Sequence, residues 1–149
     1  MTYPANRPTV DAGRLWAGGA ATALVAALVA LVGVLLFQNV FDVVMVRPPL
    51  IPISSSFAVR YAITAAVLAI VATALGHLLA LTTPRPRSFF TWIVGLATLV
   101  GVVLPFGLTG TTAGRLATAG VDLIIGLAVL SLLNSVLART VNLAPAAWR

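Results

Sequence analysis

The sequence predicts an all-α membrane protein in which four transmembrane helices form one bundle. Three observations lead to this fold class. Of the 149 residues, 60% are hydrophobic and 8% are charged, whereas a soluble domain carries about 25% charged residues. The apolar residues gather in four segments, each close to the about 20 residues that cross a hydrocarbon core. A chain inside the bilayer must satisfy its own backbone hydrogen bonds, so each segment is expected to be a helix.

The first segment is expected to be a retained membrane anchor. It follows Arg7 and Arg14, as a signal sequence does, but it is much longer than the about 7–15 apolar residues of a signal peptide. All four segments are assigned to a single transmembrane domain, residues 1–149. Their approximate bounds are 15–37, 58–81, 89–108 and 113–137.

A short turn joins the second segment to the third. This stretch, Thr82–Ser88, contains Pro84 and Pro86, which stiffen it. We therefore expect the two segments to be antiparallel neighbours. Arg85 and Arg87 in the same turn predict a preference for anionic lipid of about 1 kcal/mol each.

The placement of the arginines predicts the orientation in the membrane. With four spans, both termini lie on the same side as the turn just described. That side carries six of the nine arginines, and the other side carries Arg47, Arg60 and Arg115. Trp16, Trp92 and Trp148 also fall on the arginine-rich side, where indole rings prefer the membrane interface. The positive-inside rule then predicts a multi-pass protein of the plasma (inner) membrane with both termini in the cytoplasm.

An apolar, proline-containing external loop is predicted between the first two spans, at Asn39–Ser56. Val43–Val46 is a β-prone run, and Pro48, Pro49 and Pro52 prevent a helix through the middle. One interpretation is a loop that folds back over the mouth of the bundle. The other is a surface for a partner or a lipid, because exposed apolar patches tend to be binding sites.

Small residues at four-residue spacing predict close packing between the helices. Membrane helices associate through such residues, because lipid tails are as apolar as leucine. The first span has two adjacent stripes of this kind, more than one neighbour needs, which makes self-association plausible. The residues singled out for helix packing are Gly18, Gly19, Ala23, Gly101 and Gly126.

Asp122 is the principal candidate for a polar site inside the membrane. It lies seven residues beyond Arg115, about 10 Å deeper at 1.5 Å per residue. A charged aspartate at that depth costs about 2.5–3.5 kcal/mol. Two interpretations stay open: an interhelical hydrogen bond to a hydroxyl or carbonyl group, or a proton or cation site.

His77 is the second candidate, near the cytoplasmic end of its span. Counting from Arg60 and Arg115 puts His77 about 15 Å from Asp122 along the membrane normal, so direct contact is not expected. A relay between them would need water or hydroxyl groups, for which Thr73 and Thr118 are candidates. A neutral, locally bonded imidazole is the alternative.

Several classes of function lack the residues that they require. The chain has no cysteine and one histidine, so a thiolate or two-histidine metal or haem site is not expected. Asp11, Asp42 and Asp122 fall in three different compartments, which leaves no carboxylate pair for catalysis. The arginines are scattered between apolar runs, which favours topology signals over nucleic-acid binding. We therefore expect no catalytic residues, no cofactor, no metal and no nucleic-acid partner, and hence no enzyme.

Two stretches resemble an uncharacterised family of short actinobacterial membrane proteins with four predicted spans. They are "DAGRLWAGGAATALVAALVALVGVLL" (Asp11–Leu36) and "TPRPRSFFTWIVGLATLVGVVLPF" (Thr83–Phe106). The external loop, with its prolines, differs from the polar loop of that family. The resemblance implies four spans and carries over no activity and no functional residues.

These observations favour a non-enzymatic membrane component. Its expected role is structural or accessory, in association with itself or with another membrane protein. The alternative is a small transporter or channel that uses Asp122 as a proton or cation site. Binding of a lipid or another hydrophobic molecule is a third possibility.

Overall fold

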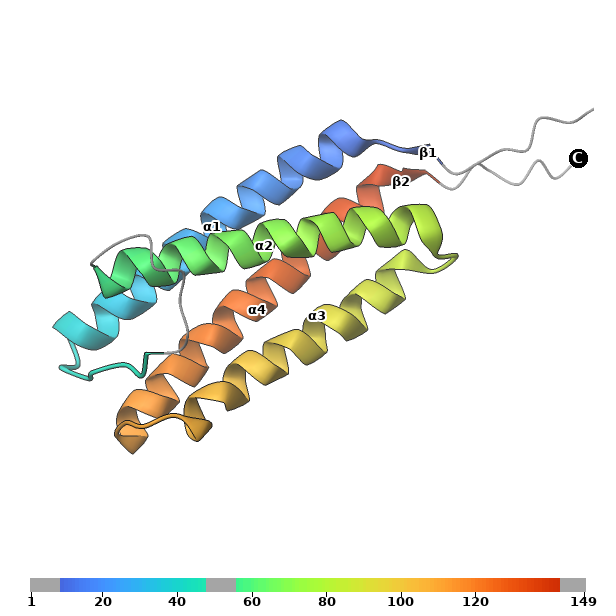
Figure 1. Cartoon of the computed structure of the whole chain (residues 1–149). Coiled ribbons are helices and arrows are strands. Elements are labelled where there is room, and N and C mark those ends of the chain that lie inside the picture. The colour runs from blue at the N-terminus through green and yellow to red at the C-terminus, as the bar shows by residue number, and fades with distance from the viewer. Residues whose placement is uncertain (1–8, 48–55, 143–149) are drawn as a thin grey trace, which may run out of the picture.

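The apolar stretches fold into four long helices. A computed structural model describes residues 9–47 and 56–142 and shows these helices side by side in one bundle (Figure 1). Each is long and apolar enough to cross a membrane when α3 is taken together with the turn that follows it. Their bounds are α1 Ala12–Asn39, α2 Phe57–Thr82, α3 Pro86–Val103 and α4 Thr112–Thr140. The predicted all-α, four-helix fold class is confirmed.

The third helix ends earlier than the predicted third segment, which reached residue 108. After Val103 the chain tightens into the 3-10 turn η1, Leu104–Gly107. Pro105 explains the change, because proline has no backbone N–H and its ring collides with the carbonyl group four residues earlier. At the other end of the helix, Pro86 stands in the first turn, where a missing N–H costs nothing.

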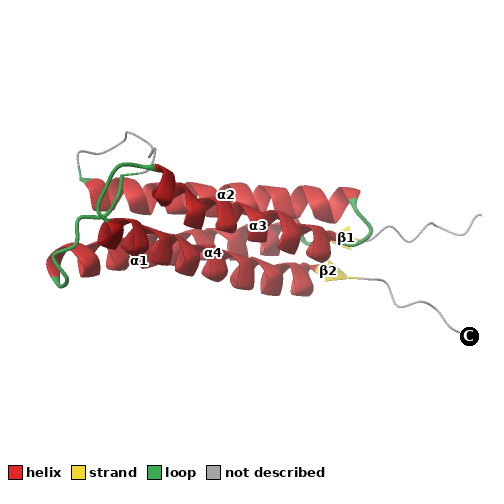
Figure 2. Ribbon diagram, turned by 90° about the horizontal axis from the view of Figure 1, so that it is seen from below, coloured by secondary structure: helices red, strands yellow, loops and turns green. Residues whose placement is uncertain are grey.

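Two short strands close one end of the bundle. β1 (Thr9–Val10) pairs antiparallel with β2 (Val141–Asn142), with Val10 opposite Val141. This pair was not predicted from the sequence. It lies at the same end as the turn between α2 and α3, which we call the terminal end (Figure 2). The opposite end, called the loop end, carries residues 40–47 and 108–111.

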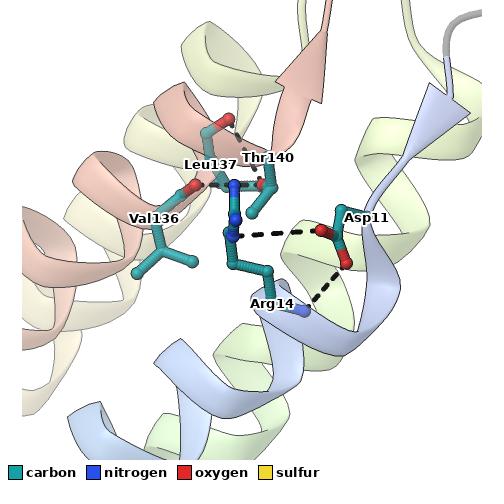
Figure 3. Close-up of polar contacts among 5 residues, drawn as sticks. All are labelled: Asp11, Arg14, Val136, Leu137 and Thr140. Carbon is teal, nitrogen blue, oxygen red and sulfur yellow. Dashed lines mark hydrogen bonds and ion pairs between the residues drawn. The ribbon is translucent and has the colours of Figure 1, made fainter.

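Polar contacts fix the start of α1 at the terminal end. The Asp11 carboxylate accepts a hydrogen bond of 3.0 Å from the Arg14 backbone N–H, which caps the helix. The Arg14 guanidinium lies 3.9 Å from the same carboxylate (Figure 3). The backbone N–H of Asp11 also donates to the Thr140 carbonyl of α4 at 3.3 Å. The start of α1 is thereby joined to the end of α4.

The described part of the loop between α1 and α2 folds back over the bundle. Met45 and Val46 are 2% and 4% exposed, and the Val46 N–H donates to the Thr118 hydroxyl at 3.0 Å. The β-prone run Val43–Val46 forms no strand in the structure described. Pro48, Pro49 and Pro52 lie outside the described residues.

The four helices do not pack equally. α1 lies against both α2 and α4, and α3 lies mainly against α4. α2 and α3 are antiparallel, as their short turn predicts, but they diverge towards the loop end (Figure 1). This divergence creates the site described next.

Candidate functional site

Asp122 forms an interhelical hydrogen bond with Tyr61. The phenolic hydroxyl of Tyr61, on α2, donates to Oδ1 of Asp122, on α4. Tyr61 is 3% exposed, and its ring lies 5.6 Å from that of Phe57. A buried phenol needs a hydrogen-bond partner, and a carboxyl group inside a membrane needs a donor. Each residue therefore satisfies the other.

The pair lies at the wall of a groove between α2, α3 and α4. The cavity has a volume of about 460 Å³. On α2 the lining runs from Tyr61 to Leu75, fourteen residues or about 21 Å of helix. Leu68 and Ile93 at its edges are 61% and 42% exposed, so the groove opens sideways between α2 and α3. Apart from Tyr61 and Asp122, its described lining consists of aliphatic side chains, glycine and threonine.

Close packing of α3 on α4 holds one side of the groove. A Cβ atom at Gly126 would collide with the Thr98 side chain of α3, so this glycine allows the two helices to approach. Gly101, also a predicted packing residue, has a different position. A Cβ there would meet only the Asp122 Cβ, at 4.0 Å. Gly101 lines the groove opposite Asp122 instead of forming a tight contact.

The remaining predicted packing residues attach α1 to its two neighbours. A Cβ atom at Gly19 would collide with Thr73 of α2, and one at Gly18 would lie 2.6 Å from Val136 of α4. Ala23 is buried in the hydrophobic core of the bundle. The two small-residue stripes of α1 thus serve two helices of the same chain.

Thr73 and Thr118, the two candidate relay residues, are both fully buried. Thr73 donates to the Ala69 carbonyl at 2.8 Å and packs against Gly19. Thr118 donates to the Gly114 carbonyl at 2.9 Å and accepts from Val46. Each hydroxyl is engaged in local structure, so in the described structure neither links Asp122 to His77.

His77 faces α1, away from Asp122. Its ring centroid is 6.4 Å from that of Trp16. The buried Nδ1 has no hydrogen-bond partner within residues 9–47 and 56–142. The structure does not bring the two candidate polar residues into one site.

The ionisable groups of the groove are therefore one carboxyl group and one phenol, and the hydroxyls of Thr64 and Thr98 each donate to a carbonyl group of their own helix at 2.8 Å. Among the described residues, no three His, Asp or Glu side chains are grouped to hold a metal ion. Asp122 can accept hydrogen bonds through two oxygens, and Tyr61 occupies one of these. The site can bind a hydrogen-bond donor beside an apolar surface.

Tyr61 is the residue of the candidate site that the sequence analysis missed. It is the one tyrosine within the four predicted segments. α2 and α4 both begin at the loop end, so a hydroxyl near the start of α2 can meet a residue of α4. The signal was the requirement of a buried phenol for a partner.

Comparison with known proteins identifies a family. No curated protein and no solved structure matches the chain. The model of a family of unknown function, DUF6069, matches residues 10–139. These residues include all four helices except the last residue of α4. A membrane protein with four apolar helices and a lateral groove, the chain belongs to the DUF6069 family of unknown function.

Proposed function

We propose that the protein is a non-enzymatic, accessory component of the membrane. Its role is to offer a surface inside the bilayer to another molecule, and it carries out no reaction of its own. The observation that supports this role best is the apolar groove of about 460 Å³ between the diverging helices α2 and α3. In a bilayer such an opening faces lipid, where it is accessible to hydrophobic molecules and to other membrane proteins.

The walls of the groove favour this role over transport. An ion or proton path needs polar groups along its length. From Asp122 towards the terminal end, the described walls of the groove are mainly aliphatic. The Thr98 hydroxyl donates to the Val94 carbonyl of its own helix at 2.8 Å. His77, at the other end of α2, faces α1.

A small transporter or channel is the second candidate, and one observation favours it. Asp122 lines the groove, and an ionisable residue within the membrane is a functional candidate by default. In this case water would have to reach the carboxyl group from one face of the membrane.

The proposed setting is the plasma (inner) membrane, with both termini in the cytoplasm. Arg85 and Arg87 are exposed at the terminal end and would contact anionic lipid there. The associated molecule would be a second copy of the chain or another membrane protein, with hydrophobic small molecules as further occupants of the groove.

A spin label in the groove distinguishes accessory protein from transporter. The chain has no cysteine, so Ala97→Cys carries one label on the groove wall. Leu28→Cys, on the exposed face of α1, is the lipid-facing control. In liposomes we expect the Ala97 label, like the control, to collide with oxygen, which partitions into lipid. It should not collide with a water-soluble nickel complex.

The outcomes differ for the two candidates. Collision of the Ala97 label with the nickel complex would show a water path and would replace the accessory role by transport. Protection from both reagents at Ala97, with oxygen still reaching Leu28, would mean that a second copy covers the groove. That result would support association.

A further inference from the structure

We propose that the groove binds an uncharged lipid alcohol, with its hydroxyl group on Asp122 and its hydrocarbon chain along α2 and α3. This inference rests on the proposed function, because it needs a groove that opens to lipid. It goes further by naming the occupant and the residue that selects it.

The size of the groove favours a single chain over a helix. A helix with its side chains is about 10–12 Å wide, so a 21 Å length occupies on the order of 2,000 Å³. The cavity holds about 460 Å³, within the range of about 300–1,000 Å³ that is typical of small-molecule sites. A partner helix could place only a row of side chains in it, whereas one hydrocarbon chain could enter.

The ionisable groups of the groove lie at one end. Tyr61 and Asp122 lie towards the loop end, and from there the α2 wall continues through Ala65, Leu68 and Ala72 to Leu75. This arrangement matches a molecule with one polar end and a long apolar body. The small side chains on α2 and Gly101 on α3 leave the space that such a body needs.

The free acceptor capacity of Asp122 favours an occupant whose polar group is a hydrogen-bond donor. The Asp122 carboxyl has acceptor capacity beyond the bond from Tyr61. An anionic headgroup would be repelled by an ionised carboxylate at this point, and a cationic one would bring a second charge into hydrocarbon. A hydroxyl group supplies the donor without burying a charge.

Two arginines near the loop end offer a competing attraction for an anionic headgroup. Arg60 directly precedes Tyr61, and Arg115 stands two turns before Asp122 on α4. The described cavity lining includes Asp122 but neither of these arginines. An occupant of the cavity therefore contacts the acceptor Asp122 and neither of the two arginines.

The test compares two probes that differ in one hydrogen-bond donor. Geranylgeraniol and its methyl ether are incorporated in equal amounts into nanodiscs that contain the full chain. Native mass spectrometry then measures the ratio of the two bound forms. We expect wild type to prefer the alcohol by about 3- to 18-fold, the ratio given by a typical hydrogen bond inside a membrane.

Three variants locate the preference. Asp122→Leu removes the acceptor, so the ratio should fall to about one. Tyr61→Phe keeps the acceptor and removes its competing donor, so the preference should be retained or increased. Gly101→Leu fills the groove and should reduce binding of both probes. Gly95→Leu on the same helix, at a position where a Cβ meets no atom within 4 Å, should leave binding unchanged.

Equal binding of alcohol and ether by wild type would overturn the proposal, as would a preference that survives Asp122→Leu. If Asp122→Leu does not fold, the alcohol-to-ether ratios of wild type and Tyr61→Phe still test the preference for the alcohol. The loss of binding in Gly101→Leu still tests whether the probes occupy the groove. An anionic phospholipid included in the same nanodiscs should bind less tightly than the alcohol, and tighter binding of it would also overturn the proposal. The preference for the alcohol can be absent while the Ala97 spin label still contacts lipid. Failure of this inference is therefore distinguishable from failure of the accessory role.

Discussion

A single carboxyl group inside the bilayer must be compensated by its contacts. Inserting a charged aspartate costs about 2.5–3.5 kcal/mol, while a hydrogen bond between membrane helices returns about 0.6 kcal/mol on average. The bond from Tyr61 therefore lowers the cost of Asp122 without removing it. An unfavourable balance of this kind is common where a residue is retained for a function.

The strength of the Tyr61–Asp122 bond can be measured with a double-mutant cycle. Tyr61→Phe keeps the ring that packs on Phe57, and Asp122→Leu removes the carboxyl group. We expect a coupling free energy of about 0.6–1.7 kcal/mol between the two substitutions, measured from unfolding in nanodiscs. Additive effects, with no coupling, would show that the bond does not contribute to stability.

Sequence reasoning reached Asp122 but not its partner. Depth along a helix can be counted from an arginine at its end, and this places Asp122 in hydrocarbon. The rotation of each helix about its axis depends on the contacts of all four helices together. With the helices rotated as they are, Thr73 packs against Gly19 and Thr118 accepts from the Val46 N–H. Tyr61 is the residue that donates to Asp122.

At the scale of the helices, the sequence predicts that each helix forms, but it predicts less well where each helix begins and ends. Runs of about 20 apolar residues leave no alternative to a helix in a bilayer. The end of α3 depends on one residue, Pro105. The first helix begins at Ala12, after its cap at Asp11, and so starts before the predicted segment, which began at residue 15. The β1–β2 pair has two residues in each strand, too few to produce a periodic pattern.

The packing of α3 on α4 predicts a contrast between two glycines of α4. Gly126→Ala places a methyl group against Thr98, whereas Gly120 has no atom within 4 Å of a Cβ position. We expect Gly126→Ala to destabilise the protein by about 1–3 kcal/mol, the usual cost of overpacking. Gly120→Ala should be neutral or slightly stabilising, because alanine favours a helix. Thermal unfolding in nanodiscs measures both.

A compensating substitution tests whether Thr98 is the cause. Thr98→Ala removes the Cγ2 and Oγ1 atoms that the new methyl group would meet and leaves the Thr98 Cβ at 2.8 Å, so it should recover part of the stability lost in Gly126→Ala. Equal effects of alanine at Gly126 and Gly120 would show that α3 does not pack on α4 as described.

The arrangement of the whole molecule depends on differences between helix pairs that composition does not reveal. Alanine or glycine recurs in every span, so a small-residue stripe does not identify its neighbour. In the structure, α1 uses both of its stripes within the chain, and α2 and α3 diverge despite their short turn. The lateral groove follows from this unequal pairing and could not be predicted from the spans alone.

The orientation of the bundle can be tested with single cysteines, since the natural chain has none. Thr109 is exposed at the loop end and Ser88 at the terminal end. The positive-inside rule places the six-arginine side in the cytoplasm. In intact cells, a membrane-impermeant maleimide should therefore label Thr109→Cys, and it should label Ser88→Cys only after the cells are permeabilised. The reverse pattern would invert the topology and would put Asp122 nearer to the cytoplasm. Labelling of both positions in intact cells would mean that the chain inserts in two orientations, so that a groove with one polar end would face both leaflets.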